Sequence, residues 1–207
     1  MIRRSARGFT LLEVLASLAL LALLMVGVYS GIRTATVSVR AGTALIERSD
    51  QLRSAQQFLR RELAQSLSQP IGRTAQGQSV VFVGTPREMR YLAPLPGYLG
   101  RLGPQLQRLQ LVDDGAGGLR LELSLALLPP DGRAPQALSE PQVLVDHILE
   151  GSFSYAGVDG SGAALGWSHT WADGRQLPQL VRVALRLGGT ASWPQLEVPL
   201  RTVSAQP

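Results

Sequence analysis

The sequence predicts an α+β protein in which one long amino-terminal helix packs on one face of a carboxy-terminal antiparallel β-sheet. Three observations lead to this fold class. A charge-free apolar segment lies near the start of the chain, leucines at helical spacing follow it, and short apolar stretches separated by glycine, proline and aspartate fill the remainder. The chain has 207 residues, 45% of them apolar, and no cysteine, so its core must hold without disulfides.

The apolar segment is long enough to cross a membrane. Residues 14–29 contain neither a charge nor a proline, and Phe9–Leu12 extend the apolar stretch toward the amino terminus. At about 1.5 Å per residue, the span that begins at Phe9 covers a bilayer core of about 30 Å. No small-x-small cleavage site follows Tyr29, so we expect the segment to be retained rather than removed as a signal peptide.

A short basic leader precedes this segment, and a single acid interrupts it. Residues 1–8 carry three arginines and no acid, so the positive-inside bias holds them in the cytoplasm while the chain beyond is exported. Glu13 lies among apolar residues, where an ionised carboxylate costs about 2.5 kcal/mol or more unless it finds a partner. Cleavage after Gly8 would expose an amino group on Phe9, and the amine of a neighbouring subunit could then neutralise Glu13.

Residues 8–13 read Gly-Phe-Thr-Leu-Leu-Glu and resemble the leader and cleavage site of type IV prepilins and type II secretion pseudopilins. The resemblance implies that a prepilin peptidase cuts after Gly8, that the exposed Phe9 is N-methylated, and that Glu13 guides insertion into a growing filament. It also implies an inner-membrane protein with a cytoplasmic amino terminus before processing and a periplasmic carboxy-terminal domain. The alternative is an ordinary signal anchor whose Glu13 lies at the membrane edge.

A second, amphipathic part of the helix is predicted beyond the membrane segment. Five leucines follow one another at spacings of seven, seven, four and four, which places them on one helical face: Leu45, Leu52, Leu59, Leu63 and Leu67. The charged residues expected mostly off this face are Arg48, Arg53, Arg60, Arg61 and Glu62. Asp50 and Arg53 are spaced to form an ion pair on the solvated side.

This pattern predicts one helix from about Phe9 to Leu67, ended by Pro70 and Gly72. Three glycines inside it either permit local bending or allow close helix packing: Gly27, Gly31 and Gly42.

The resulting organisation has four parts. We expect residues 1–8 to be a leader that is removed and residues 9–29 to be the transmembrane and assembly half of the helix. Residues 30–68 form its amphipathic half, and residues 69–207 form a periplasmic β-rich globular domain.

Short apolar stretches between turn residues predict the strands of that domain. The clearest hairpin joins residues 106–112 to residues 119–125, whose second arm alternates with period two. The other predicted strands are Val80–Val83, Met89–Leu92, Val143–Leu149, Phe153–Tyr155, Leu180–Leu187 and Leu196–Leu200.

Residues 82–96 and 153–185 resemble the J-type minor pseudopilins of type II secretion, in which an aromatic sheet region precedes a Leu-Pro pair and a final alternating strand. The resemblance implies a pilin-like fold and a place in the complex that caps the pseudopilus. Its expected partners are I-type, K-type and H-type minor pseudopilins through helix packing, the prepilin peptidase, the inner-membrane assembly platform and secreted proteins. A minor pilin of a type IV pilus shares the same amino-terminal motif and is the closest alternative.

A membrane-anchored periplasmic enzyme is the alternative of a different class. Candidate catalytic residues exist in His147, His169, Asp146 and Asp173, but the sequence contains no G-x-S-x-G, H-E-x-x-H or phosphate-loop signature. Asp146 and His147 are adjacent in an alternating stretch, so we expect them on opposite faces of a strand. We expect no catalytic site and no cofactor.

Three acidic turns, at residues 113–115, 131–132 and 159–160, are better explained by turn chemistry than by calcium, so no metal is expected. Trp167 and Trp171 are four residues apart, which predicts one sheet face and either a recognition patch or core packing.

The formal charge of +5 does not indicate a nucleic-acid partner. All 20 basic residues are arginine, and losing the three in the leader leaves 17 against 15 acids.

Overall fold

The computed structural model describes residues 11–94, 103–129, 134–158, 162–189 and 192–200, with the side chains of residues 34–42, 44 and 45 outside this description. The chain divides into two compact units, one through Arg48 and one from Ser49. The elements are α1 (Leu11–Ala64), β1 (Gly72–Arg73), β2 (Ser79–Val80), β3 (Val83–Gly84), β4 (Glu88–Pro94), β5 (Pro104–Asp113), β6 (Leu119–Leu127), β7 (Gln136–Ala137), β8 (Gln142–Val158), β9 (Ala164–Ser168), β10 (Leu180–Leu187) and β11 (Leu196–Pro199).

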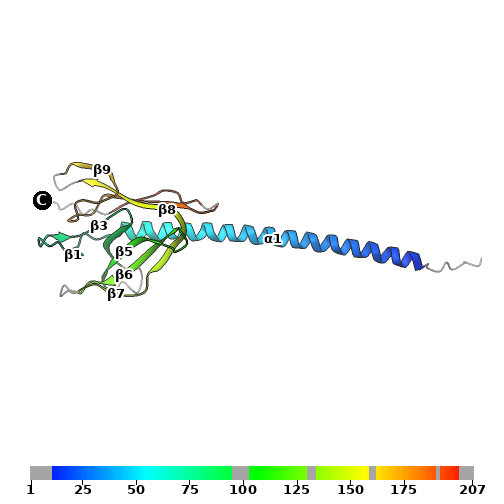
Figure 1. Cartoon of the computed structure of the whole chain (residues 1–207). Coiled ribbons are helices and arrows are strands. Elements are labelled where there is room, and N and C mark those ends of the chain that lie inside the picture. The colour runs from blue at the N-terminus through cyan, green and yellow to red at the C-terminus, as the bar shows by residue number, and fades with distance from the viewer. Residues whose placement is uncertain (1–10, 95–102, 130–133, 159–161, 190–191, 201–207) are drawn as a thin grey trace, which may run out of the picture. The chain divides into compact units, whose positions relative to one another are not determined.

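The second unit is built on an antiparallel sheet. Among the described residues it has nine strands in the order β11-β10-β8-β6-β5-β4-β3, with β7 added beside β6 and β9 beside β8, while β1 and β2 pair separately. The last turns of α1 lie against this sheet (Figure 1), and the described core combines residues of the helix and of both halves of the sheet. The predicted α+β class, with a helix on an antiparallel sheet, is confirmed.

The predicted apolar face of α1 is confirmed in this unit. Leu59 and Leu63 are fully buried, Leu52 is 6% exposed, and the pair Asp50–Arg53 has an N–O distance of 4.0 Å on the solvated side. The side chain of Leu45 lies outside the described residues.

The helix ends at Ala64, three residues before the predicted Leu67. The amide of Ser66 donates to the carbonyl of Leu63 at 3.1 Å, which tightens the last turn. The amide of Leu67 donates instead to the carbonyl of Leu92 at 2.8 Å. Pairing with β4 therefore ends the helix before Pro70 is reached.

The predicted hairpin is present as β5 and β6, and its register places Val112 opposite Arg120. Its turn is organised by Asp114, whose Oδ1 accepts the amides of Ala116 at 2.7 Å and Gly118 at 2.9 Å. These bonds lower the pKa of Asp114 because they stabilise the carboxylate. Turn chemistry is thus confirmed for this acidic turn, whereas Asp131–Gly132 and Asp159–Gly160 lie outside the described residues.

The two strands predicted at residues 143–149 and 153–155 are one continuous strand, β8. Its first part pairs with β6 and its second part with β10, and Ile148 is the residue that faces both Leu119 and Leu187. His147 just before it has a φ of 54°, at a shift of register. The predicted break at residues 150–152 was wrong because these residues pair with Ala184, Leu185 and Arg186 of β10 and so continue the strand.

The single strand predicted at Val80–Val83 is divided into β2 and β3. The amides of Val81 and Phe82 both donate to the carbonyl of Gly174, at 2.6 and 3.1 Å, instead of joining a ladder. A loop contact therefore replaces sheet pairing at these two residues.

Candidate assembly site

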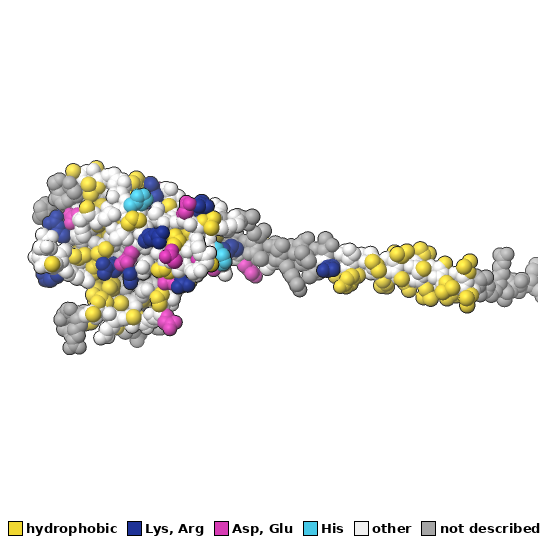
Figure 2. All heavy atoms as spheres, in the orientation of Figure 1, with side chains coloured by type: hydrophobic (Ala, Val, Ile, Leu, Met, Phe, Trp, Pro, Cys, Tyr) yellow, Lys and Arg dark blue, Asp and Glu magenta, His cyan; other side chains and the backbone are white. Residues whose placement is uncertain are grey.

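The first unit presents an apolar helical surface. Residues Leu11–Arg33 form the one segment of the described chain that is long and apolar enough to cross a membrane, with none of it buried. Its 23 residues correspond to about 34 Å of helix, slightly more than a bilayer core. Figure 2 shows apolar side chains around the described part of this segment. The surface is suited to lipid and to the helices of other proteins.

Glu13 lies in the first described turn of α1, with its side chain exposed on this apolar surface. Ser17 donates its hydroxyl to the main-chain carbonyl of Glu13 at 2.7 Å. Gly8 and Phe9, the predicted cleavage site and new amino terminus, lie outside the described residues, so their roles and that of Glu13 stay predictions.

A shallow concavity on the same helix is lined by Leu20, Leu23, Leu24, Gly27 and Val28. A Cβ added to Gly27 would meet nothing within 4 Å, so the glycine leaves room beside the two leucines that precede it. The helix continues through Gly27 and Gly31 without interruption. Close approach of another helix at this position is therefore sterically possible.

The carboxy-terminal turns of α1 are fixed to the edge of the sheet by side-chain bonds. Gln56 Nε2 donates to the carbonyl of Pro194 at 2.8 Å, and Arg60 donates to the carbonyl of Glu197 at 3.1 Å. Because Pro194 lies just before β11 and Glu197 lies in it, the helix is tied to the last described strand.

Glu62 belongs to the charged residues expected mostly off the apolar face, and it is an exception, because its side chain is only 1% exposed. Glu62 Oε2 accepts a bond from Gln107 Nε2 at 2.9 Å, and Gln107 Oε1 accepts the hydroxyl of Tyr91 at 3.0 Å. Burial raises the pKa of Tyr91, and the charge of Glu62 adds to this effect.

The missed signal was the spacing of Ala55, Leu59, Glu62 and Ser66, whose steps of four, three and four mark one helical face.

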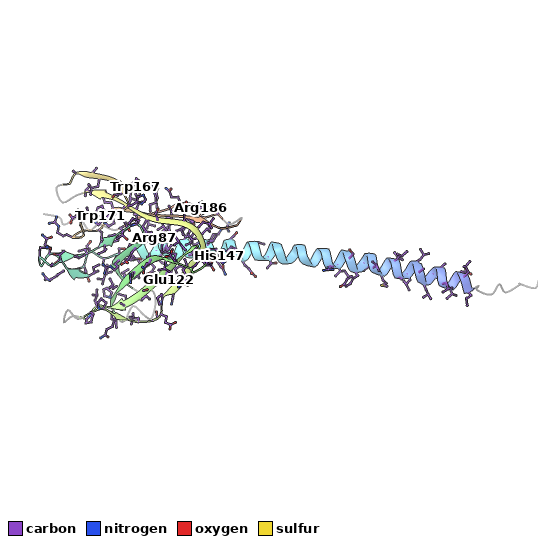
Figure 3. All side chains as sticks on the ribbon, viewed as in Figure 1. Arg87, Glu122, His147, Trp167, Trp171 and Arg186 are labelled. Atoms are coloured by element: carbon purple, nitrogen blue, oxygen red, sulfur yellow. The ribbon has the colours of Figure 1, made fainter. Side chains whose placement is uncertain are left out.

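The four candidate catalytic residues do not gather into one site. His147 Nδ1 lies 3.2 Å from Asp146 Oδ1 (Figure 3 labels His147), so the expectation that these neighbours face opposite ways was wrong. The positive φ of His147 turns its side chain out of the regular alternation. His169 Nδ1 lies 3.0 Å from the carbonyl oxygen of Phe153, and Asp173 forms an ion pair with Arg175 at 2.9 Å.

The described residues also contain no group of three or more histidines and acids placed to hold a metal ion.

The two tryptophans have different environments, contrary to the expectation of one shared sheet face. Trp167 lies in β9 and is 39% exposed, with the Arg182 guanidinium 3.7 Å from the centre of its ring. Trp171 is 6% exposed and donates its indole N–H to the carbonyl of Gln176 at 2.9 Å. The expectation was wrong because β9 ends at Ser168, so the strand alternation does not extend to residue 171. Both labelled side chains can be compared in Figure 3.

Comparison with known proteins relates the chain to secretion and methylation-motif proteins. Residues 3–29 match the prokaryotic N-terminal methylation motif. A solved structure, the GspK-GspI-GspJ complex of the enterotoxigenic Escherichia coli type 2 secretion system, includes a chain that is 20% identical. The match covers 72% of this chain and 92% of that chain, with a TM-score of 0.48.

The type II secretion system protein J of Xanthomonas campestris pv. campestris is 37% identical over 201 residues, which cover 96% of this chain and 94% of that protein. Similarity at this level over nearly the whole length establishes common descent. The chain therefore belongs to the family of type II secretion system protein J.

Proposed function

We propose that this chain is a minor pseudopilin at the tip of a type II secretion pseudopilus, where it supports the export of folded proteins across the outer membrane. The observation that carries the proposal is the 37% identity to a type II secretion system protein J over 96% of the chain. The exposed apolar segment Leu11–Arg33 adds the membrane and assembly element that such a subunit requires.

The proposed processing begins at the leader. A prepilin peptidase would cut after Gly8 and Phe9 would be N-methylated, which the match of residues 3–29 to the methylation motif supports. Before processing, the three leader arginines hold the amino terminus on the cytoplasmic face of the inner membrane. The sheet domain then lies in the periplasm.

Assembly would use the first half of α1. Apolar helices pack by close contact, and Glu13 would be neutralised by the amine of a neighbouring subunit, since an unpaired carboxylate is costly in hydrocarbon. The proposed neighbours are I-type, K-type and H-type minor pseudopilins, together with the inner-membrane assembly platform. Secreted proteins would contact the periplasmic domain.

The proposed role is structural rather than catalytic, in keeping with the family. His147, His169, Asp146 and Asp173 each have local partners within the described residues. This arrangement supports turns and strands rather than a shared reaction site.

The test is intact-mass measurement and amino-terminal sequencing of the protein purified from membranes of its own host. We expect a chain that begins at N-methylated Phe9 and that co-purifies with I-type and K-type pseudopilins. A chain that retains Met1, or one cut beyond Tyr29, would contradict the proposal.

Complementation provides the functional arm of the test. A strain that lacks the gene should lose its exported enzymes from the culture medium, the full chain should restore them, and a Gly8→Val variant should not. Glu140→Gln, a change at an exposed residue of the domain, is the matched control and should restore export fully.

A further inference from the structure

We infer that Glu62, Gln107 and Tyr91 form a hydrogen-bonded cluster, the polar key, that is satisfied in only one register of α1 on the sheet. The cluster thereby fixes where the domain is attached along the helix. The inference concerns the unit from Ser49 onward. It rests on the proposed function only for its consequence, because a subunit incorporated through its helix must present its domain at a defined position.

The apolar part of this interface does not select a register by itself. Leu52, Ala55, Leu59 and Leu63 repeat at helical spacing along the buried face of α1. Apolar contacts are non-directional, so a shift of the helix by one turn, about 5.4 Å, would place one apolar side chain where another had been.

Glu62 breaks this equivalence. It is the one charged side chain among the buried residues that the structure describes, and its Oε1 has no hydrogen-bond partner. A buried carboxylate bonded on one oxygen only is unfavourable for stability compared with an apolar side chain of similar size. The best-supported role of a buried polar residue at a helix interface is to specify the register of the helix, as polar residues do at the core positions of coiled coils.

The receiving side is held in one orientation. Tyr91 on β4 and Gln107 on β5 are directly opposite each other, and the hydroxyl of Tyr91 donates to Gln107 Oε1 at 3.0 Å. Because this oxygen is already engaged, the amide Nε2 of Gln107 points its donor at the helix, where Glu62 Oε2 accepts it at 2.9 Å. The carboxylate on the helix therefore meets a donor that the sheet has oriented in advance.

A one-turn shift would break this match on both sides. A shift in one direction would bring Leu59 opposite Gln107, and the Gln107 donor would then be buried without an acceptor, which is the costly outcome for a hydrogen-bonding group. A shift in the other direction would carry the Glu62 carboxylate to the apolar site that Leu59 occupies. The bonds from Gln56 and Arg60 discriminate less, since both go to main-chain carbonyls at the exposed edge of the sheet.

The register can be read by disulfide trapping, because the chain contains no cysteine of its own. Gln56 contacts Pro194 in the register described, so a cysteine pair at 56 and 194 reports that register. Pairs at 53 and 194 and at 60 and 194 report shifts of about one turn in either direction. All pairs are introduced in the full-length chain and oxidised in membranes of the host.

With Glu62 and Gln107 unchanged, we expect the pair at 56 and 194 to form about tenfold more disulfide than either shifted pair. A ratio of this size corresponds to the cost of leaving one buried donor unpaired in the shifted register. In a Glu62→Leu and Gln107→Leu background, we expect the shifted pairs to rise to yields comparable with it. A single dominant pair in that background would overturn the inference.

A charge swap gives a second test that does not depend on the leucine variant. Gln107→Glu alone places two carboxylates face to face, so we expect loss of the dominant disulfide and of export into the medium. Adding Glu62→Gln restores a donor opposite an acceptor and leaves the new carboxylate at position 107 able to accept the hydroxyl of Tyr91, so both readouts should return. Failure of the double swap to restore the dominant disulfide would overturn the inference.

The two readouts separate this inference from the proposed function. The disulfide pattern reports the register whatever the protein does, whereas export reports secretion. A restored disulfide pattern with no effect of any variant on export would support the key and contradict the proposed function.

Discussion

Truncation of Leu59 to alanine should destabilise the sheet domain more than any change on its surface. The Leu59 side chain is fully buried between α1 and the sheet. Removal of a buried leucine side chain to Cβ costs roughly 3–5 kcal/mol, since it loses transfer free energy and leaves a cavity. For a unit of this size that corresponds to a fall in the unfolding midpoint of roughly 6–20 °C.

The assay is thermal unfolding of the full chain in detergent, followed by tryptophan fluorescence. Trp171 and Trp193 are 6% and 7% exposed, so their emission reports loss of the domain core. Leu138→Ala is the matched control, because that leucine is 37% exposed and follows the short strand β7. A fall for Leu59→Ala no larger than that of the control would refute the argument that α1 is held by its apolar face.

Three further predictions concern single sites. Gly84→Ala would place a Cβ 2.6 Å from Cζ of Tyr155, so we expect a loss of about 1–3 kcal/mol in the free energy of unfolding. The same thermal assay measures this loss, and an unchanged unfolding midpoint would contradict the prediction. Asp114 has a lowered pKa in the fold, so its contribution is present above the unfolded value of about 3.9 and is lost as the pH falls through the folded value. Asp114→Asn should therefore flatten the fall in unfolding midpoint below pH 4, and an identical acid profile in both proteins would count against this reasoning. Glu13→Leu should leave cleavage of the leader intact, which amino-terminal sequencing measures. The same variant should impair incorporation, measured by cross-linking to the other pseudopilins in membranes. Normal incorporation would refute the charge-pairing role.

Much of the architecture follows from periodicity. The apolar segment is visible because residues 14–29 carry no charge. The helical face appears in the spacing of Leu52, Leu59 and Leu63, all buried as expected. The hairpin of β5 and β6 was predictable because its second arm alternates and its turn carries Asp114 before glycines with positive φ, such as Gly115 at 79°. Local patterns of this kind depend on a few neighbouring residues.

The parts that could not be predicted depend on contacts distant in sequence. Glu62 is buried because Gln107, 45 residues later, offers it a hydrogen-bond donor. Helix propensity cannot predict a contact between residues so far apart in the sequence. The helix stops at Ala64 because Leu67 pairs with Leu92, although Leu67 fits the leucine spacing. β8 continues through the irregularity at His147 because strands on both sides hold it.

The roles of Gly8 and Phe9 rest on the sequence motif alone, since those residues lie outside the described structure.

The side-chain bonds between α1 and the last described strand set an order of events during folding. The bonds from Gln56 and Arg60 reach residues 138 and 137 positions later, and the fully buried Val198 belongs to the same terminal strand. Contacts of such long sequence separation form late and slowly in folding. The amphipathic part of α1 is thus made long before β11, the strand to which it is tied. Its apolar face, which includes Leu59 and Leu63, is fully covered only after the last described strand has been synthesised.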